Sequence, residues 1–181
     1  MPGSGGFMDP ARIAAGFGLA QGMRAADFGS GSGYFTILMA KMVGDSGLVT
    51  AVDLMNAALE TLRAKAKAEG LGNIQTVRSN LEVLGSSGLA SDSQDVVLLA
   101  NILFQNSNKE SILSEARRVV RPGGSIIVIV WRKGTGGFGP PDELRTDEEE
   151  MKRLVIGNDG FQFVNPIDAG IFHYGLVFKK I

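Results

Sequence analysis

A glycine-rich stretch constrains this chain more than any other part of its sequence. Residues 25–28 (Ala-Ala-Asp-Phe) lead into Gly29-Ser30-Gly31-Ser32-Gly33, and apolar residues follow at helical spacing. This order predicts a strand over Arg24–Phe28, a tight loop, and a helix that runs to Val43. Glycines let the backbone approach a bound molecule closely, and the helix N-terminus offers free N–H groups and a positive dipole end. The stretch therefore predicts a ligand-binding loop that favours an anionic group.

The spacing of these glycines separates two classes of cofactor. The dinucleotide fingerprint requires a glycine three residues after the second one, where this chain has Tyr34. A phosphate-binding loop that ends in Gly-Lys-Ser or Gly-Lys-Thr is also absent. The glycine spacing therefore makes a nicotinamide-dependent oxidoreductase the least favoured function for this chain.

Apolar runs of strand length recur along the rest of the chain, at 48–53, 74–78, 95–100 and 125–131. Amphipathic segments between them predict helices, except at 85–92, where a Gly/Ser loop is too short for a crossover helix. The final runs, 161–168 and 171–180, are joined by a short link and predict an antiparallel hairpin. The expected fold class is α/β, with a Rossmann-like, doubly wound, mainly parallel seven-stranded sheet and a C-terminal antiparallel hairpin.

Polar residues mark the expected starts of four helices. They are Asp9 followed by Pro10, then Asn56, then Asn108, and a capping box formed by Thr146 with Glu149. The box also accounts for the acidic run that follows Thr146, because acids suit the N-terminal end of a helix dipole. We therefore expect a solvated helix face there and no metal site.

Composition bounds the class of protein. The 181 residues, 44% of them hydrophobic, predict a single domain over residues 9–181 after a flexible segment of residues 1–8. A formal net charge of −1 argues against a nucleic-acid partner, although a local basic patch is compatible with it. The absence of cysteine excludes disulfides and thiolate chemistry. No apolar run reaches the ~18 residues of a membrane span, and the N-terminal residues lack a basic segment followed by an apolar one. We therefore expect a cytoplasmic rather than a secreted protein. The oligomeric state is open.

Three features resemble the class I S-adenosylmethionine-dependent methyltransferases. They are the Asp-x-Gly-x-Gly-x-Gly loop of residues 27–33, the Arg-Pro-Gly-Gly break of residues 121–124 before an apolar strand, and the terminal hairpin. Together they cover nearly the whole chain from Arg24 onward. The resemblance implies S-adenosylmethionine as cofactor and is strongest to small-molecule methyltransferases of the quinone-biosynthesis or type 11 kind. The segment 101–106 lacks the Asn/Asp-Pro-Pro-aromatic sequence of enzymes that methylate adenine or glutamine, which argues against those acceptors.

The resemblance also implies which residues bind the cofactor. The methionyl part is expected at the glycine loop, the ribose at Asp53, the adenine between Leu54 and Leu81, and the methyl group near Asn101. An acid that closes the second strand, 24 residues after Gly29, stands beside the loop and can take both ribose hydroxyls. The full expected set is Asp27, Gly29, Ser30, Gly31, Gly33, Asp53, Leu54, Asn80, Leu81 and Asn101. Two alternatives stay open, namely a helix-start acid for Asp53 and local backbone bonding for Asn80.

The acceptor side of the site is less defined by the sequence. Aromatic and apolar residues near the carboxyl edge of the sheet are the candidates for the acceptor pocket: Phe104, Trp131, Phe138, Pro140 and Tyr174. Their alternative is hydrophobic packing. The Gly/Pro-rich segment 133–145 is expected to be a lid or substrate loop rather than a passive linker.

No residue stands out as a general base. The candidate catalytic residues are His173, Tyr174 and Asn101, and for His173 a structural or packing role is favoured. We therefore expect S-adenosylmethionine-dependent methyl transfer to a small, partly apolar acceptor by in-line displacement at the carboxyl edge of the sheet. The alternatives are an RNA or protein methyltransferase, which would need a basic surface around the cleft, and a non-catalytic module that binds S-adenosylmethionine.

Overall fold

The computed structural model describes residues 8–106, 108–157 and 160–181, and within them seven strands form one sheet in the order β3-β2-β1-β4-β5-β7-β6. The strands are β1 (Arg24–Phe28), β2 (Leu48–Asp53), β3 (Ile74–Arg78), β4 (Gln94–Ala100), β5 (Val120–Trp131), β6 (Phe161–Ile167) and β7 (His173–Lys180). Strands β1 to β5 pair in parallel, whereas β7 is antiparallel to both β5 and β6. This confirms the predicted α/β class with its terminal hairpin. The expected flexible segment 1–8 lies, except for Met8, outside the described residues.

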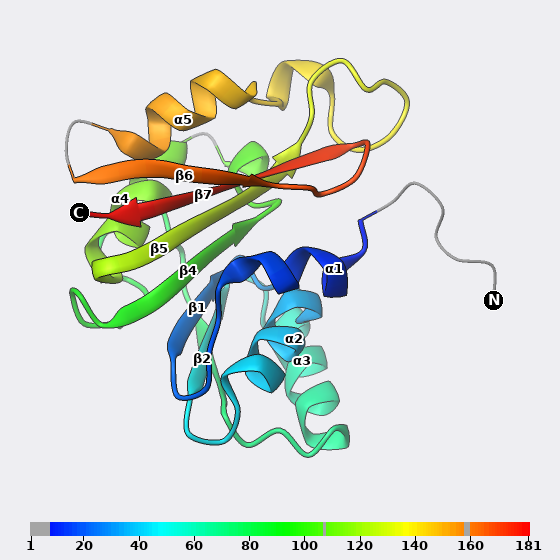
Figure 1. Cartoon of the computed structure of the whole chain (residues 1–181). Helices are drawn as coiled ribbons and strands as arrows, with labels where there is room; N and C mark the ends of the chain where they lie inside the picture. Colours follow the sequence, from blue (N-terminus) through cyan, green and yellow to red (C-terminus); the bar gives the residue numbers. More distant parts are fainter. Residues whose placement is uncertain (1–7, 107, 158–159) are drawn as a thin grey trace.

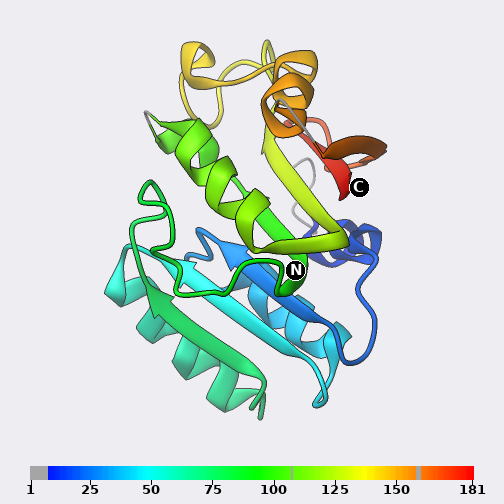
Figure 2. The ribbon, with the colours of Figure 1, turned by 90° about the vertical axis from the view of Figure 1, so that its left-hand side faces the viewer.

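Helices cover both faces of the sheet (Figures 1 and 2). They are α1 (Pro10–Ala14), α2 (Tyr34–Val43), α3 (Asn56–Ala68), α4 (Lys109–Val119) and α5 (Glu148–Ile156). Side chains of α1 and α2 pack with Val49, Leu98 and Ile127 on one face, and α3 packs beside them. Side chains of α4 and α5 pack with their sheet neighbours Val97 and Val128 on the opposite face. The strands are thus buried on both faces, which explains their continuous apolar runs. None of the described helices combines the length and the apolar character needed to cross a membrane.

Two of the four predicted helix caps are confirmed. Asp9 accepts hydrogen bonds from the backbone of Ala11 and Arg12, with Pro10 in the first turn of α1. Asn108 Oδ1 accepts a hydrogen bond from the N–H of Ser111 at 3.2 Å.

The other two helices form as predicted, α3 from Asn56 and α5 from Glu148, but the capping residues predicted for them are wrong. Helix α3 is preceded by Met55 at its N-cap, and the side chain of Asn56 donates to Glu60 at 2.7 Å instead of capping. Helix α5 is capped by Asp147, which accepts from the N–H of Glu150 at 2.8 Å, because the buried Thr146 points inward and accepts from Lys109 Nζ at 3.1 Å.

The connection between β3 and β4 is irregular, as predicted, and it is held by a buried carboxylate of α4. Glu115 accepts hydrogen bonds from the N–H groups of Gly85 at 2.7 Å and Ser87 at 3.3 Å, and from Arg118 Nη2 at 2.7 Å. This carboxylate therefore fixes the loop that stands in place of a crossover helix.

Two strand boundaries differ from the expectation. Strand β5 begins at Val120 rather than at residue 125, so that residues 121–124 belong to the strand, with a register irregularity against Gln94 and Val96. Strand β7 begins at His173 rather than at residue 171.

Candidate active site

The carboxyl ends of β1 to β4 border a cleft of about 460 Å³, which we call the carboxyl-edge cleft. Its lining includes seven of the ten predicted cofactor-binding residues, from four segments of the chain: Gly29, Gly31, Asp53, Leu54, Asn80, Leu81 and Asn101. Asp27, Ser30 and Gly33 lie beside the cleft in sequence but are not part of its lining. The fold therefore brings most of the predicted set together, and the individual roles stay predictions.

Asp53 joins the second strand to the glycine loop. Its Oδ2 accepts a hydrogen bond from the N–H of Gly31 at 2.8 Å, and its Oδ1 accepts one from the N–H of Met55 at 2.8 Å. A carboxylate has about four lone-pair sites, so both oxygens keep capacity for a ligand hydroxyl. The same carboxylate thus orders the loop and borders the cleft.

The glycine loop uses four of its own N–H groups within the protein. Gly29 and Ser30 both donate to the carbonyl oxygen of Val52, at 2.8 and 3.2 Å, and Gly33 donates to the carbonyl oxygen of Ser30 at 3.0 Å. Gly31 donates to Asp53, as described above. These four N–H groups are therefore not available to the anionic ligand group that the glycine pattern predicts.

Asp27 is a buried carboxylate in the second-last position of β1. It accepts a hydrogen bond from Thr36 Oγ1 of α2 at 2.6 Å. Burial raises the pKa of Asp27 to about 6; the hydrogen bond from Thr36 opposes this shift, and the charge of Asp53 adds to it. Neither Asp27 nor Asp53 forms an ion pair with any residue in the described ranges. The two acids therefore form a negative site that lacks a cation from the chain itself.

Each of the three loop positions is occupied by glycine for a different structural reason. Gly33 has φ of +86° at the start of α2, and a Cβ there would overlap the side chain of Leu62. Gly29 has φ of +76°, and a Cβ there would lie 2.6 Å from Ile102 Cδ1. Gly31 has φ of +52° with open space around the position of a Cβ. Gly31 is therefore the glycine that leaves room for a ligand.

Local bonding at Asn80 matches the alternative left open above. Asn80 Oδ1 accepts a hydrogen bond from the N–H of Glu82 at 3.0 Å, which leaves its Nδ2 and one lone pair of Oδ1 for a ligand. Leu54 is 58% exposed at the cleft, whereas Leu81 is buried beneath it.

Asn101 follows β4 and reaches His173 at the start of β7. Asn101 has a left-handed φ of +55°, and its Nδ2 lies 3.3 Å from His173 Nε2. The His173 ring is buried against Trp131, with 4.0 Å between ring centroids. Burial, and next the positive charge of Arg145, lower the pKa of His173 to about 4. His173 is therefore neutral at pH 7.

The five predicted acceptor-pocket residues do not share one pocket. Tyr174 is buried on the face of the sheet that α4 and α5 cover. Its hydroxyl donates to the carbonyl oxygen of Thr146 at 2.7 Å. Burial raises the pKa of Tyr174. Phe104 is half-buried in the turn Leu103–Gln105, and Trp131 is half-buried beneath Arg145.

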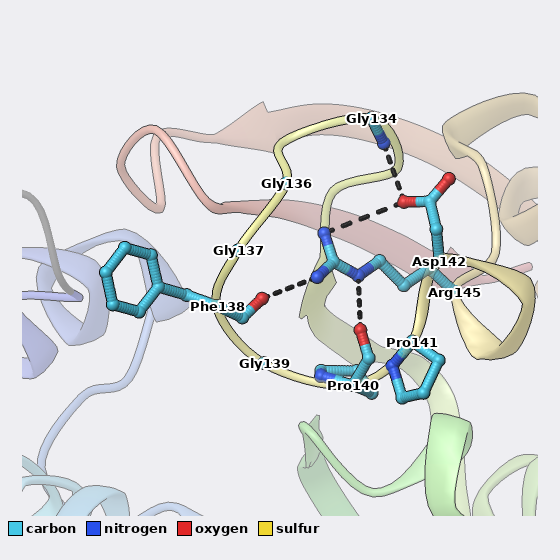
Figure 3. Close-up of a pocket in the computed structure, with 9 residues that line it drawn as sticks. All are labelled: Gly134, Gly136, Gly137, Phe138, Gly139, Pro140, Pro141, Asp142 and Arg145. Atoms are coloured by element: carbon cyan, nitrogen blue, oxygen red, sulfur yellow. Dashed lines mark hydrogen bonds and ion pairs between the residues drawn. The ribbon is translucent and has the colours of Figure 1, made fainter.

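Phe138 and Pro140 line a separate hollow of about 440 Å³ in the 133–145 loop (Figure 3). The guanidinium of Arg145 lies inside this loop, and it donates to the carbonyl oxygens of Arg132 at 2.8 Å, Pro140 at 2.9 Å and Phe138. Figure 3 shows the ring of Phe138 pointing away from the hollow. The loop predicted as a lid is thus closed around one buried arginine.

Several lining residues were given no role from the sequence, among them Met55, Ala58, Glu82 and Ile112. Met55 and Glu82 lie within a few residues of strand ends that the sequence predicted. Their position next to those strand ends could have identified them as cleft residues. Ala58 and Ile112 come from helices α3 and α4 and gave no comparable signal.

Comparison with known proteins supports one family. A family model described as a methyltransferase domain matches residues 25–124 of the 181. The ubiquinone/menaquinone biosynthesis C-methyltransferase UbiE of Shewanella pealeana is 30% identical over 117 residues, which cover 64% of this chain and 45% of the relative. An arsenite methyltransferase of Aquipseudomonas alcaligenes is 34% identical over 137 residues, covering 72% of this chain and 38% of the relative. The chain thus spans less than half the length of these curated relatives.

The fold agrees with that match. The crystal structure of an S-adenosylmethionine-dependent methyltransferase from Aquifex aeolicus superposes with a TM-score of 0.85 and 26% identity, covering 97% of this chain and 91% of that one. Because the family match extends over more than half of the sequence and the fold agrees over nearly all of it, the chain belongs to the class I S-adenosylmethionine-dependent methyltransferases.

Proposed function

We propose that this chain transfers a methyl group from S-adenosylmethionine to a small, partly apolar molecule by in-line displacement at the carboxyl edge of the sheet. The observation that carries the proposal is the pair of acids, Asp27 and Asp53, without a counter-cation beside a glycine loop whose amides are already used. S-adenosylmethionine carries two positive groups, a sulfonium and an ammonium. A cationic ligand of this kind suits the cleft better than a pyrophosphate does.

Residues in the cleft and beside it fit the remaining parts of this cofactor. Asp53 keeps free lone pairs for ribose hydroxyls, and the exposed Leu54 offers an apolar surface for a flat ring. The buried Ser30 Oγ has no hydrogen-bond partner among the described residues, which leaves it for the amino-acid tail of the cofactor. Asp27 would hold the ammonium group.

When bound, the cofactor supplies a methyl group that its sulfonium has already activated. The chain's own residues then have to bind the two reactants, align them and exclude water. Alignment alone supplies ~7–11 kcal/mol of the barrier reduction in favourable cases. We assign no general base, since His173 is buried beside Trp131 and Tyr174 donates to a backbone carbonyl.

A small acceptor is supported by the names of the relatives, which act in quinone biosynthesis or on arsenite. The lining of the carboxyl-edge cleft includes the apolar side chains of Met55, Ala58 and Ile102, which offer surface to a partly apolar acceptor. A cytoplasmic location belongs to the same proposal.

Two measurements test the proposal. Calorimetric titration with S-adenosylmethionine is expected to give saturable binding. Incubation with methyl-labelled S-adenosylmethionine and fractionated cell extract is then expected to place the label in small molecules. Label in RNA or protein would instead support the second kind of methyltransferase, and tight binding without any transfer would support a binding module. Absence of cofactor binding would refute all three.

A further inference from the structure

Asn101 and His173 meet at the carboxyl edge of the sheet, and each keeps one buried polar atom unpaired. Asn101 Nδ2 lies 3.3 Å from His173 Nε2. Asn101 Oδ1 and His173 Nδ1 have no hydrogen-bond partner within the described part of the chain. An unpaired buried polar group costs ~1–3 kcal/mol, and such groups call for a ligand or a water as partner.

The backbone of Asn101 adopts an uncommon conformation. Its φ of +55° is uncommon for a residue other than glycine, although Asn tolerates it better than most. The N–H of Asn101 donates to the carbonyl oxygen of Ile129 at 2.8 Å, and its own carbonyl accepts from Gln105 Nε2 at 3.1 Å. Backbone strain of this kind is concentrated at ligand sites. Asn101 also lines the carboxyl-edge cleft.

The contact between the two side chains fixes their polarity. An amide Nδ2 donates, so the facing Nε2 of His173 must be an acceptor without a proton. A neutral imidazole then carries its proton on Nδ1. Burial of the ring disfavours a charged imidazole, and so does the positive charge of Arg145, whose guanidinium contacts the Trp131 ring that packs against His173. Asn101 Oδ1 is then the free end of the amide.

We propose that Asn101 Oδ1 recognises the methyl acceptor by accepting a hydrogen bond from one of its O–H or N–H groups, and that His173 is a positioning residue that holds the amide in this orientation. The inference rests on the proposed function and narrows its substrate class. The acceptor carries a hydroxyl or an N–H next to its apolar part. Ethers, ketones and hydrocarbons of the same shape bind less well, because they leave Oδ1 unpaired.

The first test reads the tautomer of His173, which is the only histidine of the chain. Nitrogen-15 NMR of the free protein is expected to show a neutral ring with its proton on Nδ1. A proton on Nε2 would overturn the proposal, because the amide would then present its donor end. Asn101→Asp can only accept, so it is expected to move the proton to Nε2. An unchanged tautomer in Asn101→Asp would remove the positioning role of His173.

The second test uses three probes of similar size: phenol, anisole and toluene. Each is titrated into protein saturated with S-adenosylhomocysteine, and binding is followed on the indole N–H signal of Trp131, the only tryptophan. Phenol is expected to bind about 3- to 10-fold more tightly than anisole and toluene, the range that one neutral hydrogen bond supplies. Equal affinities, or no response to any probe, would overturn the proposal.

Variants assign this preference to the two residues. Asn101→Gly accepts the positive φ without strain and is expected to abolish the preference for phenol. The matched control is Asp92→Gly, since Asp92 has the same φ of +55° at the opposite end of β4, and it is expected to retain the preference. His173→Gln, which keeps an acceptor facing Asn101, is expected to retain it, whereas His173→Phe loses it. A preference for phenol that survives Asn101→Gly would overturn the assignment.

These readouts do not require turnover. Failure to bind S-adenosylmethionine or to transfer methyl groups refutes the proposed function, while the tautomer of His173 still decides the orientation of Asn101. Conversely, methyl transfer with a proton on Nε2 refutes only the inference.

Discussion

Asp27 and Asp53 lie on neighbouring parallel strands, where burial of Asp27 and then the charge of Asp53 raise the pKa of Asp27 to about 6. The hydrogen bond from Thr36 only partly offsets this effect. Holding Asp27 ionised at pH 7 therefore costs free energy in the protein alone. A cation bound next to Asp27 would offset this free-energy cost. Cofactor binding is therefore coupled to the ionisation of Asp27.

We therefore expect the affinity for S-adenosylmethionine to depend on pH. Below about pH 6 Asp27 is protonated, and affinity is expected to fall by up to about tenfold per pH unit if only the ionised form binds the ammonium group. Calorimetric titrations across this range measure the effect, and Asp27→Asn is expected to flatten the profile. An affinity that does not change between about pH 5 and pH 7 would contradict this linkage.

The same shift predicts a change in stability. Because the pKa in the folded protein lies above the ordinary value of 3.8, the contribution of Asp27 to stability is fully present below pH 3.8 and is lost as pH rises through about 6. Asp27→Asn is therefore expected to raise the free energy of unfolding at pH 7 relative to the native sequence. Urea unfolding should show that this advantage disappears at acid pH; an advantage of equal size at both pH values would argue for another cause.

Asp53→Ala is expected to weaken cofactor binding by ~2–4 kcal/mol, because it removes charged hydrogen bonds to the ribose and also releases Gly31 and Met55. Isothermal calorimetry measures the loss. Asp45→Ala removes an exposed acid from the turn after α2 and serves as the matched control, with no expected effect. Unchanged affinity in Asp53→Ala would mean that the ribose is held elsewhere.

The sequence was sufficient to predict the sheet and the approach of Gly31 to Asp53. Continuous apolar runs identify strands buried on both faces, and parallel order brings the carboxyl ends of β1 and β2 to one edge. The cap of α5 was misplaced by one residue, because Thr146 and Asp147 are both good capping residues and only the burial of Thr146 decides between them.

Contacts between distant segments could not be predicted in this way. Asn101 and His173 are 72 residues apart, and no local pattern reports that their side chains meet. Arg145 stands at the end of a Gly/Pro-rich loop, where the pattern indicates an irregular segment but not a buried guanidinium that binds its carbonyls. The acceptor side of the site consists largely of such contacts, which explains why the five predicted pocket residues are scattered.

The glycines of the loop are expected to respond differently to the same substitution. Gly33→Ala should lower the free energy of unfolding by about 2–4 kcal/mol, since it combines a positive φ with overlap against Leu62. Gly31→Ala should cost only about 1–2 kcal/mol of backbone strain but should weaken cofactor binding, because its Cβ would enter the cleft. Thermal unfolding and calorimetry separate the two effects. Equal stability of both variants would contradict the assignment of Gly33 to packing.

Arg145→Lys is expected to loosen the 133–145 loop without changing the affinity for S-adenosylmethionine. A lysine ammonium is a compact point charge and cannot match the planar fork that bonds the carbonyls of Arg132, Phe138 and Pro140. Limited proteolysis is expected to cut the variant faster within this loop. Lys133→Arg, which alters a cation at an exposed position of the same loop, provides the control. Equal cleavage rates in the native protein and Arg145→Lys would show that the loop is held by other contacts.

Glu115→Gln is expected to release the β3–β4 connection. Burial alone would raise the pKa of Glu115, but hydrogen bonds from Arg118, Ser87 and the N–H of Gly85 outweigh it and lower the pKa to about 2. The stabilisation from this carboxylate is therefore complete above its ordinary pKa of 4.5 and is lost as pH falls through about 2.

At pH 7 the substitution should cost roughly 3 kcal/mol of unfolding free energy, and the difference from the native protein should shrink between about pH 4.5 and pH 2. Hydrogen exchange at the amides of Gly85 and Ser87 should accelerate in the variant, since both donate to Glu115. Glu110→Gln, at a mostly exposed position of the same helix, is the matched control and should change neither quantity appreciably. A cost that stays constant down to pH 2 would mean that shape, rather than the charge of Glu115, holds the loop in place.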